Sequence, residues 1–210
     1  MNELLKMTAH QVKEGKFDKV ILAIGSCEAH GQHLAEGCDT IVSYELSKQV
    51  ADRVPGMLVL PPITVGYSGH YDTFPFTLTF DYETMIHVIY DIVESVLRNG
   101  INKIFLMNGH DGNIAPIEIA ARKIKEKYPD ARIASLPEWW VIAGKLVPEG
   151  TFAVWNGLGH AGEGETSIAY HLFPQWCEPD QATCVVPDHL PEHVDIKWDF
   201  AEITDTAQTG

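Results

Sequence analysis

Acidic and imidazole side chains gather in three short stretches of this chain, and side chains of these types bind divalent metals. The first stretch, GSCEAHGQHLAEGCDT, covers residues 25–40. If its start is extended, Glu28 and His30 point to the same side, because alternate side chains of an extended chain share a side. Asp39 stands where we expect the N-cap of a helix that begins at Thr40. Its second carboxylate oxygen could then reach a metal, and a carboxylate can bridge two cations.

The second stretch is NGHDGN, residues 108–113, in which His110 lies between two glycines. Gly109 and Gly112 allow the tight turn that leads from a strand into a helix. This turn would leave His110 at the same edge of a sheet as the first stretch.

The third stretch is GHAGEGETS, where His160, Glu163 and Glu165 lie within six residues, just before an apolar helix. A lone acid at a helix start is usually only a cap, and a lone histidine in a loop is usually a surface residue. Three such clusters at junctions between strands and helices favour one shared site instead. Mixed nitrogen and oxygen donors suit Zn²⁺, Mn²⁺ or Fe²⁺.

Apolar runs and amphipathic stretches alternate along the chain, which predicts an α/β fold. The apolar runs predict strands over residues 19–25, 57–63, 103–108 and 131–136. Helical spacing of apolar side chains predicts helices over residues 39–52, 84–97, 113–127 and 165–172. Right-handed crossovers then give a mainly parallel sheet with helices on both faces. The first two stretches follow predicted strands, at the edge where ligands bind in open sheets.

The charge of the chain disfavours two classes of partner. Its 210 residues carry Lys+Arg 15 against Asp+Glu 29, a formal net charge of −14. Nucleic acid is bound largely through Lys and Arg, and anionic membrane through the same side chains, so we expect neither partner. No apolar run approaches the roughly 20 residues that a membrane span needs.

No linker or repeat divides the chain, so we expect one domain over residues 1–210. The N-terminus lacks the apolar core of a signal peptide, and the four cysteines show no CxxC spacing. Both features are typical of a cytoplasmic protein with reduced thiols. The stretch from Pro174 onward has little periodicity, which predicts an extended arm or a subunit contact. The final residues, DTAQTG, look like an interruption of the chain more than its end, so we expect further sequence after them.

Two motifs resemble other enzyme classes and are rejected. Gly157, Gly159 and Gly162 match GxGxxG, the dinucleotide fingerprint, but the strand before them is short and the acidic residues that follow would face the pyrophosphate. VGYSGH around Ser68 approaches the nucleophile elbow of serine hydrolases, yet His70 occupies the place of the second glycine. We therefore expect neither an oxidoreductase nor a serine hydrolase.

Four segments, in order GSCEAHGQHLAEGCDT, VGYSGHYDTFPFTLT, NGHDGN and HAGEGETS, resemble the four signatures of the creatininase (creatinine amidohydrolase) family. The resemblance covers about residues 20–172. It implies a creatininase-like α/β fold, assembly as a homohexamer, and a centre of two divalent metal ions. Zn²⁺ is the first expectation for these ions, with Mn²⁺ or Fe²⁺ as alternatives. The resemblance also implies a hydrolase that acts on a small-molecule substrate.

The family motifs also imply roles for individual residues. The implied metal ligands are Glu28, His30, Asp39, His110 and Glu165. Asp39 bridges the ions in this hypothesis, with Glu28 and His110 on one ion and with His30 and Glu165 on the other. His160 matches the position of the family's catalytic histidine. Glu163 is then expected to carry a proton or to anchor the metal ligands from behind. Glu163 and Glu165 exchange roles if the helix begins at a slightly different residue.

Departures from the family pattern leave the substrate open. Creatininase itself has a glutamate at the position of Gly112, and the family usually has glycine where this chain has Phe76, which predicts a reshaped pocket near His70. Tryptophans surround the substrate of creatininase at positions near three tryptophans of this chain. The candidate substrate contacts are therefore His70, Trp139, Trp140 and Trp155, although the tryptophans are equally suited to core or interface packing.

The expected reaction is hydrolysis of a C–N bond in a small, cyclic amide or a formamide. Two cations about 3.5 to 4 Å apart can acidify a shared water and polarise a carbonyl, while His160 moves a proton to the leaving nitrogen. The family also includes a formamidopyrimidine deformylase, the mycofactocin-precursor peptidase and a hydrolase that opens the ring of a dehydrogenated inosose. Two alternatives therefore stay open: C–C ring opening of a cyclic diketone, and noncatalytic ligand binding or assembly after loss of the glutamate at Gly112.

Overall fold

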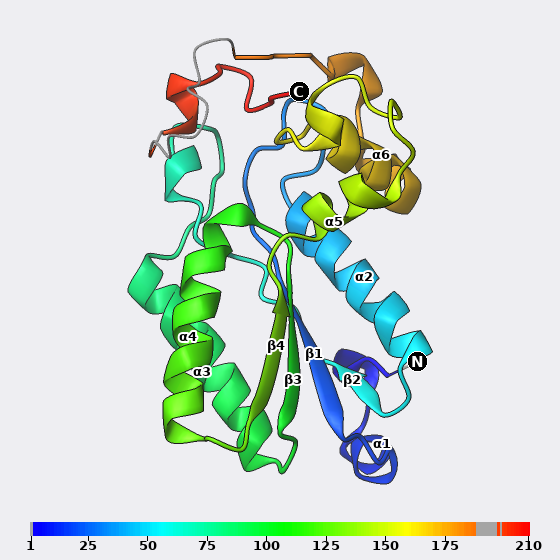
Figure 1. The fold of residues 1–210 in the computed structure, drawn as a ribbon, viewed down its shortest axis with the longest axis vertical. Coiled ribbons are helices and arrows are strands. Elements are labelled where there is room, and N and C mark those ends of the chain that lie inside the picture. The colour runs from blue at the N-terminus through cyan, green and yellow to red at the C-terminus, as the bar shows by residue number, and fades with distance from the viewer. Residues whose placement is uncertain (1, 188–196, 198) are drawn as a thin grey trace.

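A four-stranded parallel sheet forms the centre of the protein, as the sequence predicts. A computed structural model describes residues 2–187, 197 and 199–210 (Figure 1). The strands lie in the order β2-β1-β3-β4. Their bounds are β1 Lys19–Ile24, β2 Met57–Val59, β3 Lys103–Asn108 and β4 Arg132–Leu136.

Helices cover both faces of this sheet, which confirms the expected α/β class (Figure 1). Helix α2, Cys38–Arg53, packs on one face against β1, β2 and β3. Helices α3, Tyr82–Arg98, and α4, Ile114–Lys127, pack together on the other face. The alternation of side chains along β1 explains both layers, because successive strand residues face opposite sides.

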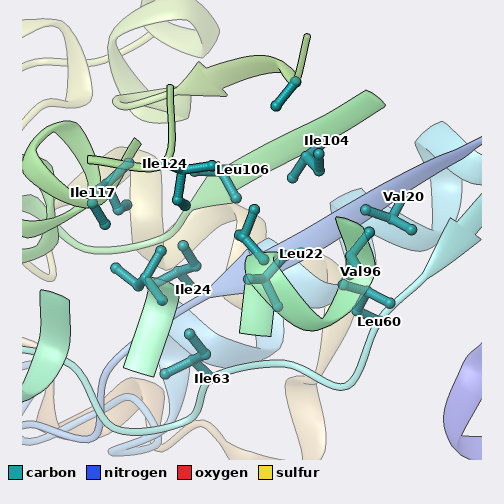
Figure 2. Packing of buried hydrophobic residues seen from close by; sticks show 14 of the residues in the cluster. Val20, Leu22, Ile24, Leu60, Ile63, Val96, Ile104, Leu106, Ile117 and Ile124 are labelled. Carbon is teal, nitrogen blue, oxygen red and sulfur yellow. The ribbon is translucent and has the colours of Figure 1, made fainter. Parts of the chain in front are cut away.

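Apolar side chains fill the layer between the sheet and helices α3 and α4 (Figure 2). Leu22 and Ile24 of β1 are fully buried there with Leu106 of β3. Ile21, which directly precedes Leu22 in β1, points to the opposite face of the sheet and joins a separate cluster with Ala51 of α2. Burial of apolar side chains on both faces holds β1 in place. The loop after β1 therefore leaves the sheet in a fixed direction.

The structure differs from the sequence prediction at several element ends. Strand β2 ends at Val59, four residues before the expected Ile63, because prolines at 61 and 62 have no N–H to donate. Helix α1, Ala9–Glu14, was not predicted, although Thr8 and Gln11 form a capping box at its start. The remaining helices are α5 Trp139–Leu146 and α6 Glu163–Leu172. The described 3-10 turns are Leu4–Lys6, Gly69–Tyr71, Asp111–Asn113, Trp155–Gly157, Pro174–Trp176, Pro179–Gln181 and Phe200–Glu202.

The expected N-cap role of Asp39 is wrong. Helix α2 begins at Cys38, and its N-cap is Gly37, so Asp39 lies inside the first turn. Its carboxylate accepts a hydrogen bond from the Ser26 hydroxyl and faces two imidazoles, so it is not available to cap the helix. The first turn therefore directs this carboxylate toward the edge of the sheet.

The stretch from Pro174 onward forms 3-10 turns in its described part and then returns to the body of the protein. Residues 188–196 and 198, which belong to the predicted arm, lie outside the described residues. Phe200 packs on Tyr71, with 4.6 Å between the ring centroids. No helix among the described residues is long and apolar enough to cross a membrane.

A buried side chain, that of Asn113, ties the ends of three segments together. Its amide nitrogen donates to the Gly25 carbonyl at 2.9 Å, and its amide oxygen accepts from the Tyr67 N–H at 3.0 Å. Asn113 is fully buried, so water cannot replace either partner. This residue thereby joins the end of β1, the loop at Tyr67 and the start of α4.

We expect Asn113→Ala to lower the free energy of unfolding by about 2–4 kcal/mol, because it leaves the buried Gly25 carbonyl and the half-buried Tyr67 N–H without their partner. Equilibrium denaturation in urea measures this loss. Exposed Asn99 donates one side-chain hydrogen bond, to the Ser95 carbonyl, so Asn99→Ala is the control and should cost less than about 1 kcal/mol. Equal losses in the two variants would contradict the role given to Asn113.

Candidate metal centre

Four segments bring acidic and imidazole side chains to the carboxyl edge of the sheet. The loop after β1 carries Glu28 and His30, and the first turn of α2 carries Asp39. His110 follows β3, and Glu165 lies in the first turn of α6. These segments meet above the strands in Figure 1, where the loop after β1 rises from the sheet and turns back into the start of α2.

The turn after β3 approaches α2 closely because residue 109 is a glycine. A Cβ atom at Gly109 would lie 2.4 Å from the backbone oxygen of Asp39. No real side chain tolerates this contact, so Gly109 is what permits His110 to reach the first turn of α2.

The carboxylate of Asp39 lies between two imidazoles, each facing a different oxygen. His30 Nε2 is 2.9 Å from Oδ1, and His110 Nδ1 is 3.1 Å from Oδ2. Oδ2 also accepts a hydrogen bond of 2.6 Å from the Ser26 hydroxyl. One carboxylate thus offers an oxygen to each of two neighbouring sets of donors, which is the arrangement that a bridging ligand needs.

Glu28 supplies the observation that most favours a cation. Its side chain is fully buried, and neither carboxylate oxygen has a hydrogen-bond donor among the described residues. Oε1 lies 3.1 Å from His110 Nδ1. A buried carboxylate whose oxygens accept no well-formed hydrogen bond is costly even with an imidazole 3.1 Å away, and a metal ion at this place would satisfy it. The residues present therefore fit a divalent cation.

Ligand atoms within 4.8 Å of one another define two groups that share Asp39. The first group is Glu28, Asp39 and His110, and the second is His30, Asp39 and Glu165. These are the two sets into which the family motifs divide the expected ligands. Glu28, His30 and His160 form a further group, so His160 lies at the same centre.

Backbone carbonyls orient the imidazoles. His30 Nδ1 lies 3.1 Å from the Glu28 carbonyl, and His110 Nε2 lies 2.8 Å from the Tyr67 carbonyl. When these nitrogens donate to the carbonyls, the opposite nitrogen of each ring is left to face Asp39 and to bind a metal.

Burial and the crowding of charges displace the pKa values of these groups. Burial alone would lower the pKa of His30, but the Asp39 carboxylate outweighs it and raises that pKa to about 10. The pKa of His110 is raised by Glu28 and Asp39 against the same burial. Burial would raise the pKa of Asp39, and the two imidazoles hold it well below its usual value. Burial raises the pKa of Glu165 to about 7.

His160 lies beside the ligands at the wall of a small cavity. Its Nε2 is 2.8 Å from the Ala29 carbonyl, and its ring centroid is 4.4 Å from that of His30. Burial, with a contribution from His30, lowers the pKa of His160 to about 3. The cavity has a volume of about 180 Å³. Its lining residues are Asp39, Tyr71, Gly109, His110, Asp111, Trp140, Gly157, Leu158, Gly159, His160 and Glu165.

The two glutamates at the start of α6 occupy different places. Glu165 Oε2 is 3.8 Å from His30 Nε2 and accepts a hydrogen bond of 2.7 Å from the Ala161 N–H. Glu163 Oε2 accepts a hydrogen bond of 2.8 Å from the Val154 N–H, and Glu163 belongs to none of the candidate metal-binding groups among the described residues. Of the two glutamates, Glu165 is therefore positioned to bind an ion, and Glu163 anchors the preceding loop.

The four candidate substrate residues are not brought together at the cavity. Trp140 lines it, whereas Trp139 is buried in a core cluster beside α2 and α6. Trp155 is 44% exposed and lies outside the lining. His70 stacks on His110, with ring centroids 5.6 Å apart, so it contacts a candidate ligand and not the cavity.

The two departures from the family pattern differ in their place in the structure. A Cβ atom at Gly112 would lie 2.2 Å from the Tyr67 carbonyl and 2.6 Å from His110 Nε2, so a glutamate could not enter this position without moving the backbone. Phe76 has a positive φ of 56° and is 86% exposed, and it lies outside the lining of the cavity.

The sequence analysis missed two residues of the site. Tyr71 lines the cavity, and its ring centroid is 4.6 Å from that of His160. Phe200 also packs on His160, at 5.0 Å. Tyr71 belongs to the segment VGYSGHYDTFPFTLT, which could have suggested it. Nothing in the sequence pattern near Phe200 could have done so, since it is distant in the chain.

This geometry defines a class of protein: an α/β fold whose sheet edge carries a buried donor set for divalent metal, shared through one carboxylate. The sequence profile of the creatininase family, described as creatinine amidohydrolase, matches residues 5–210. The chain belongs to the creatininase family and is a hydrolase of the metal-dependent type.

Two curated relatives are similar over most of this chain. The creatinine amidohydrolase of Pseudomonas putida is 31% identical over 187 residues, which cover 82% of this chain and 69% of the relative. The mycofactocin precursor peptide peptidase of Mycobacterium ulcerans is 27% identical over 183 residues, 83% of this chain and 66% of the relative. The chain thus spans about two thirds of the length of these relatives.

Solved creatininase structures have the same fold. The structure named "Creatininase Mn" superposes with a TM-score of 0.79 at 27% identity and covers 98% of this chain and 86% of its own. A mutant creatininase of the Zn-Zn type superposes with a TM-score of 0.78 at 28% identity, and the match covers 98% of this chain and 85% of the mutant chain. A mutant creatininase complexed with creatine gives 0.79 at 27% identity, with the same coverage.

Metal binding should release protons from the metal-free chain. With a pKa of about 10, His30 carries a proton at pH 7, and so does His110, whose pKa is raised as well. A bound metal requires neutral imidazoles, so affinity should rise with pH until the histidines have lost their protons. Titration calorimetry with Zn²⁺ in buffers of different ionisation enthalpy should detect this release. His30→Gln, the control, should release fewer protons, and heats that do not depend on the buffer would contradict the charge state described.

Proposed function

We propose that this chain hydrolyses a C–N bond of a small amide, cyclic amide or formamide with two divalent cations. The observation that carries the proposal is the shared carboxylate of Asp39, which presents one oxygen to His30 and the other to His110. Glu28 and Glu165 complete the two ligand sets on either side. Hydrolases that use paired cations hold them about 3.5 to 4 Å apart, a separation that one bridging carboxylate supports.

The cations would be Zn²⁺ in the first instance, with Mn²⁺ or Fe²⁺ as alternatives, because imidazole and carboxylate donors suit all of them. Similar structures are named for manganese and for zinc, which supports the first two. When bound, the cations would polarise the substrate carbonyl and make a nearby water more acidic.

His160 is placed to move the proton in this reaction. When its Nε2–H donates to the Ala29 carbonyl, Nδ1 has no proton and can accept one from the attacking water. The water oxygen forms a bond to the carbonyl carbon, and His160 passes the proton to the leaving nitrogen as the C–N bond breaks. The rings of Tyr71 and Phe200 pack on the imidazole, which limits the orientations open to it.

The size of the cavity supports a small substrate, and the names of the relatives support the hydrolysis of an amide bond. A volume of about 180 Å³ leaves room for a compact molecule beside Trp140. Creatinine amidohydrolase and mycofactocin precursor peptide peptidase are both named for hydrolysis of C–N bonds. Ring opening of a cyclic diketone is the alternative reaction, because the same water and the same His160 would serve it. The retained His160 and Glu165 weigh against a noncatalytic role.

Removing the bridge and removing the proton carrier should have different effects. We expect Asp39→Ala to lose both bound metals and all activity, because both ligand sets include its carboxylate. His160→Ala should keep its metals while its turnover falls by about 10²–10⁴-fold, the usual contribution of a general acid–base group. Metal analysis and turnover of creatinine, other cyclic amides, formamides and cyclic diketones measure these effects.

The control for these variants is His87→Ala, since His87 is exposed on α3 and far along the chain from every ligand. It should retain metals and turnover. An Asp39→Ala protein with full metal content and activity would contradict the bridging role. A metal-replete wild type that hydrolyses none of the amides but opens the cyclic diketone would replace the C–N reaction with the alternative.

We also propose that residues 1–210 form one domain that acts in the cytoplasm as a homohexamer. Exposed apolar side chains on α5 and the loop after it support an interface between copies, because soluble monomers rarely expose such groups together. These side chains are Ile142, Leu146, Trp155 and Leu158.

Leu146→Asp should dissociate the assembly, because Leu146 is 79% exposed in the single chain and a buried charge would be costly at an interface. Light scattering coupled to gel filtration should find six copies for the wild type and fewer for the variant. The matched control is Leu5→Asp, at an exposed site away from α5. A wild type that elutes as a single copy would contradict the hexamer.

A further inference from the structure

Residues 206–210, which we call the return segment, lie against two loops of the metal centre. Ala207, Gln208 and Thr209 are buried, with exposed fractions of 0%, 3% and 6%. The Ala207 carbonyl accepts a hydrogen bond of 2.7 Å from the N–H of Gly31, which directly follows the candidate ligand His30. The return segment is therefore part of the structure that surrounds the site.

Within the return segment, Thr209 holds both backbone polar groups of His160. The His160 N–H donates to Thr209 Oγ1 at 3.1 Å, and the Thr209 N–H donates to the His160 carbonyl at 2.9 Å. The two chains are in close contact here, because a Cβ atom at Gly159 would lie 1.8 Å from the Thr209 carbonyl. A single residue thus fixes the backbone from which the imidazole projects.

His160 has little other support from regular structure. It lies between the 3-10 turn Trp155–Gly157 and the start of α6 at Glu163. The next residue, Ala161, has a positive φ of 51°, a conformation that surrounding contacts must hold in place. The placement of the imidazole against the Ala29 carbonyl therefore depends on the position of the His160 backbone.

We propose that Thr209 is a positioning residue, whose hydroxyl holds the His160 backbone so that the imidazole faces the metal centre. The inference rests on the proposed role of His160 in hydrolysis. Thr209 lies outside the donor groups found among the described residues, so its loss should leave metal binding intact. Its effect should appear in the chemical step, because a displacement of about 1 Å in a reacting group can cost about a hundredfold in rate.

The test compares Thr209→Val, which keeps the shape and removes the acceptor, with Thr209→Ser, which keeps the hydroxyl. We expect Thr209→Val to lower kcat by roughly ten- to a hundredfold, with KM within about twofold, and Thr209→Ser to restore it. Metal content should match the wild type in both. The control is Thr206→Val, because the Thr206 side chain bonds to Thr204 and not to His160. Thr209→Ala, which adds no bulk, replaces the valine variant if that variant does not fold.

Amide hydrogen exchange at His160 provides a measurement that does not depend on turnover. Exchange should become faster in Thr209→Val and stay unchanged in Thr206→Val. Thr209→Val with wild-type kcat and unchanged exchange would overturn the inference, and so would loss of the metals together with activity. A wild type inactive on every amide and diketone would contradict the proposed function, while the exchange rates would still decide whether Thr209 holds His160.

Discussion

The crowding of three carboxylates at one edge of the sheet is the constraint on which the rest of the structure depends. Glu28 and Asp39 are buried, and Glu165, with 13% of its side chain exposed, lies beside Asp39. Removing an ionised carboxylate from water costs several kcal/mol unless opposite charge is supplied. In the metal-free chain the protonated His30 and His110 supply it, and a pair of cations would supply it more strongly. The same residues therefore support the fold and are the candidate metal ligands, so protons and a bound metal would compete for them.

The architecture concentrates these groups by simple means. Parallel strands deliver the loops after β1 and β3 to the same edge, and α2 begins there with Asp39 in its first turn. Gly109 lets the β3 turn approach that first turn, and Asn113 joins the end of β1 to the start of α4. The apolar layers on both faces hold the strands in register. The rigidity of the site thus comes from the core, while its chemistry comes from the loops.

The sequence predicts the parts of the protein that follow local rules. Buried strands and amphipathic helices have clear periods, so the parallel sheet with two helical layers is predicted correctly. The candidate ligands Glu28, His30 and His110 are predicted just after strands because their clusters follow the apolar runs. The prediction that Asp39 is the N-cap of α2 is wrong, because the helix begins earlier, at Cys38, where no capping side chain marks its start. Phe200 and Thr209 are missed because only long-range contacts bring them to His160, and no local pattern encodes such contacts.

Membership of the creatininase family fixes the class of chemistry as metal-dependent hydrolysis. The backbone at Gly112 leaves no room for a glutamate side chain, so in the proposed centre Glu165 would take the place of a ligand on the second ion. The most direct test of this account is anomalous diffraction at the zinc edge from crystals of zinc-loaded protein. The account predicts two peaks about 3.5 to 4 Å apart, one on each side of the Asp39 carboxylate. A single peak, or two peaks that do not share Asp39, would contradict it.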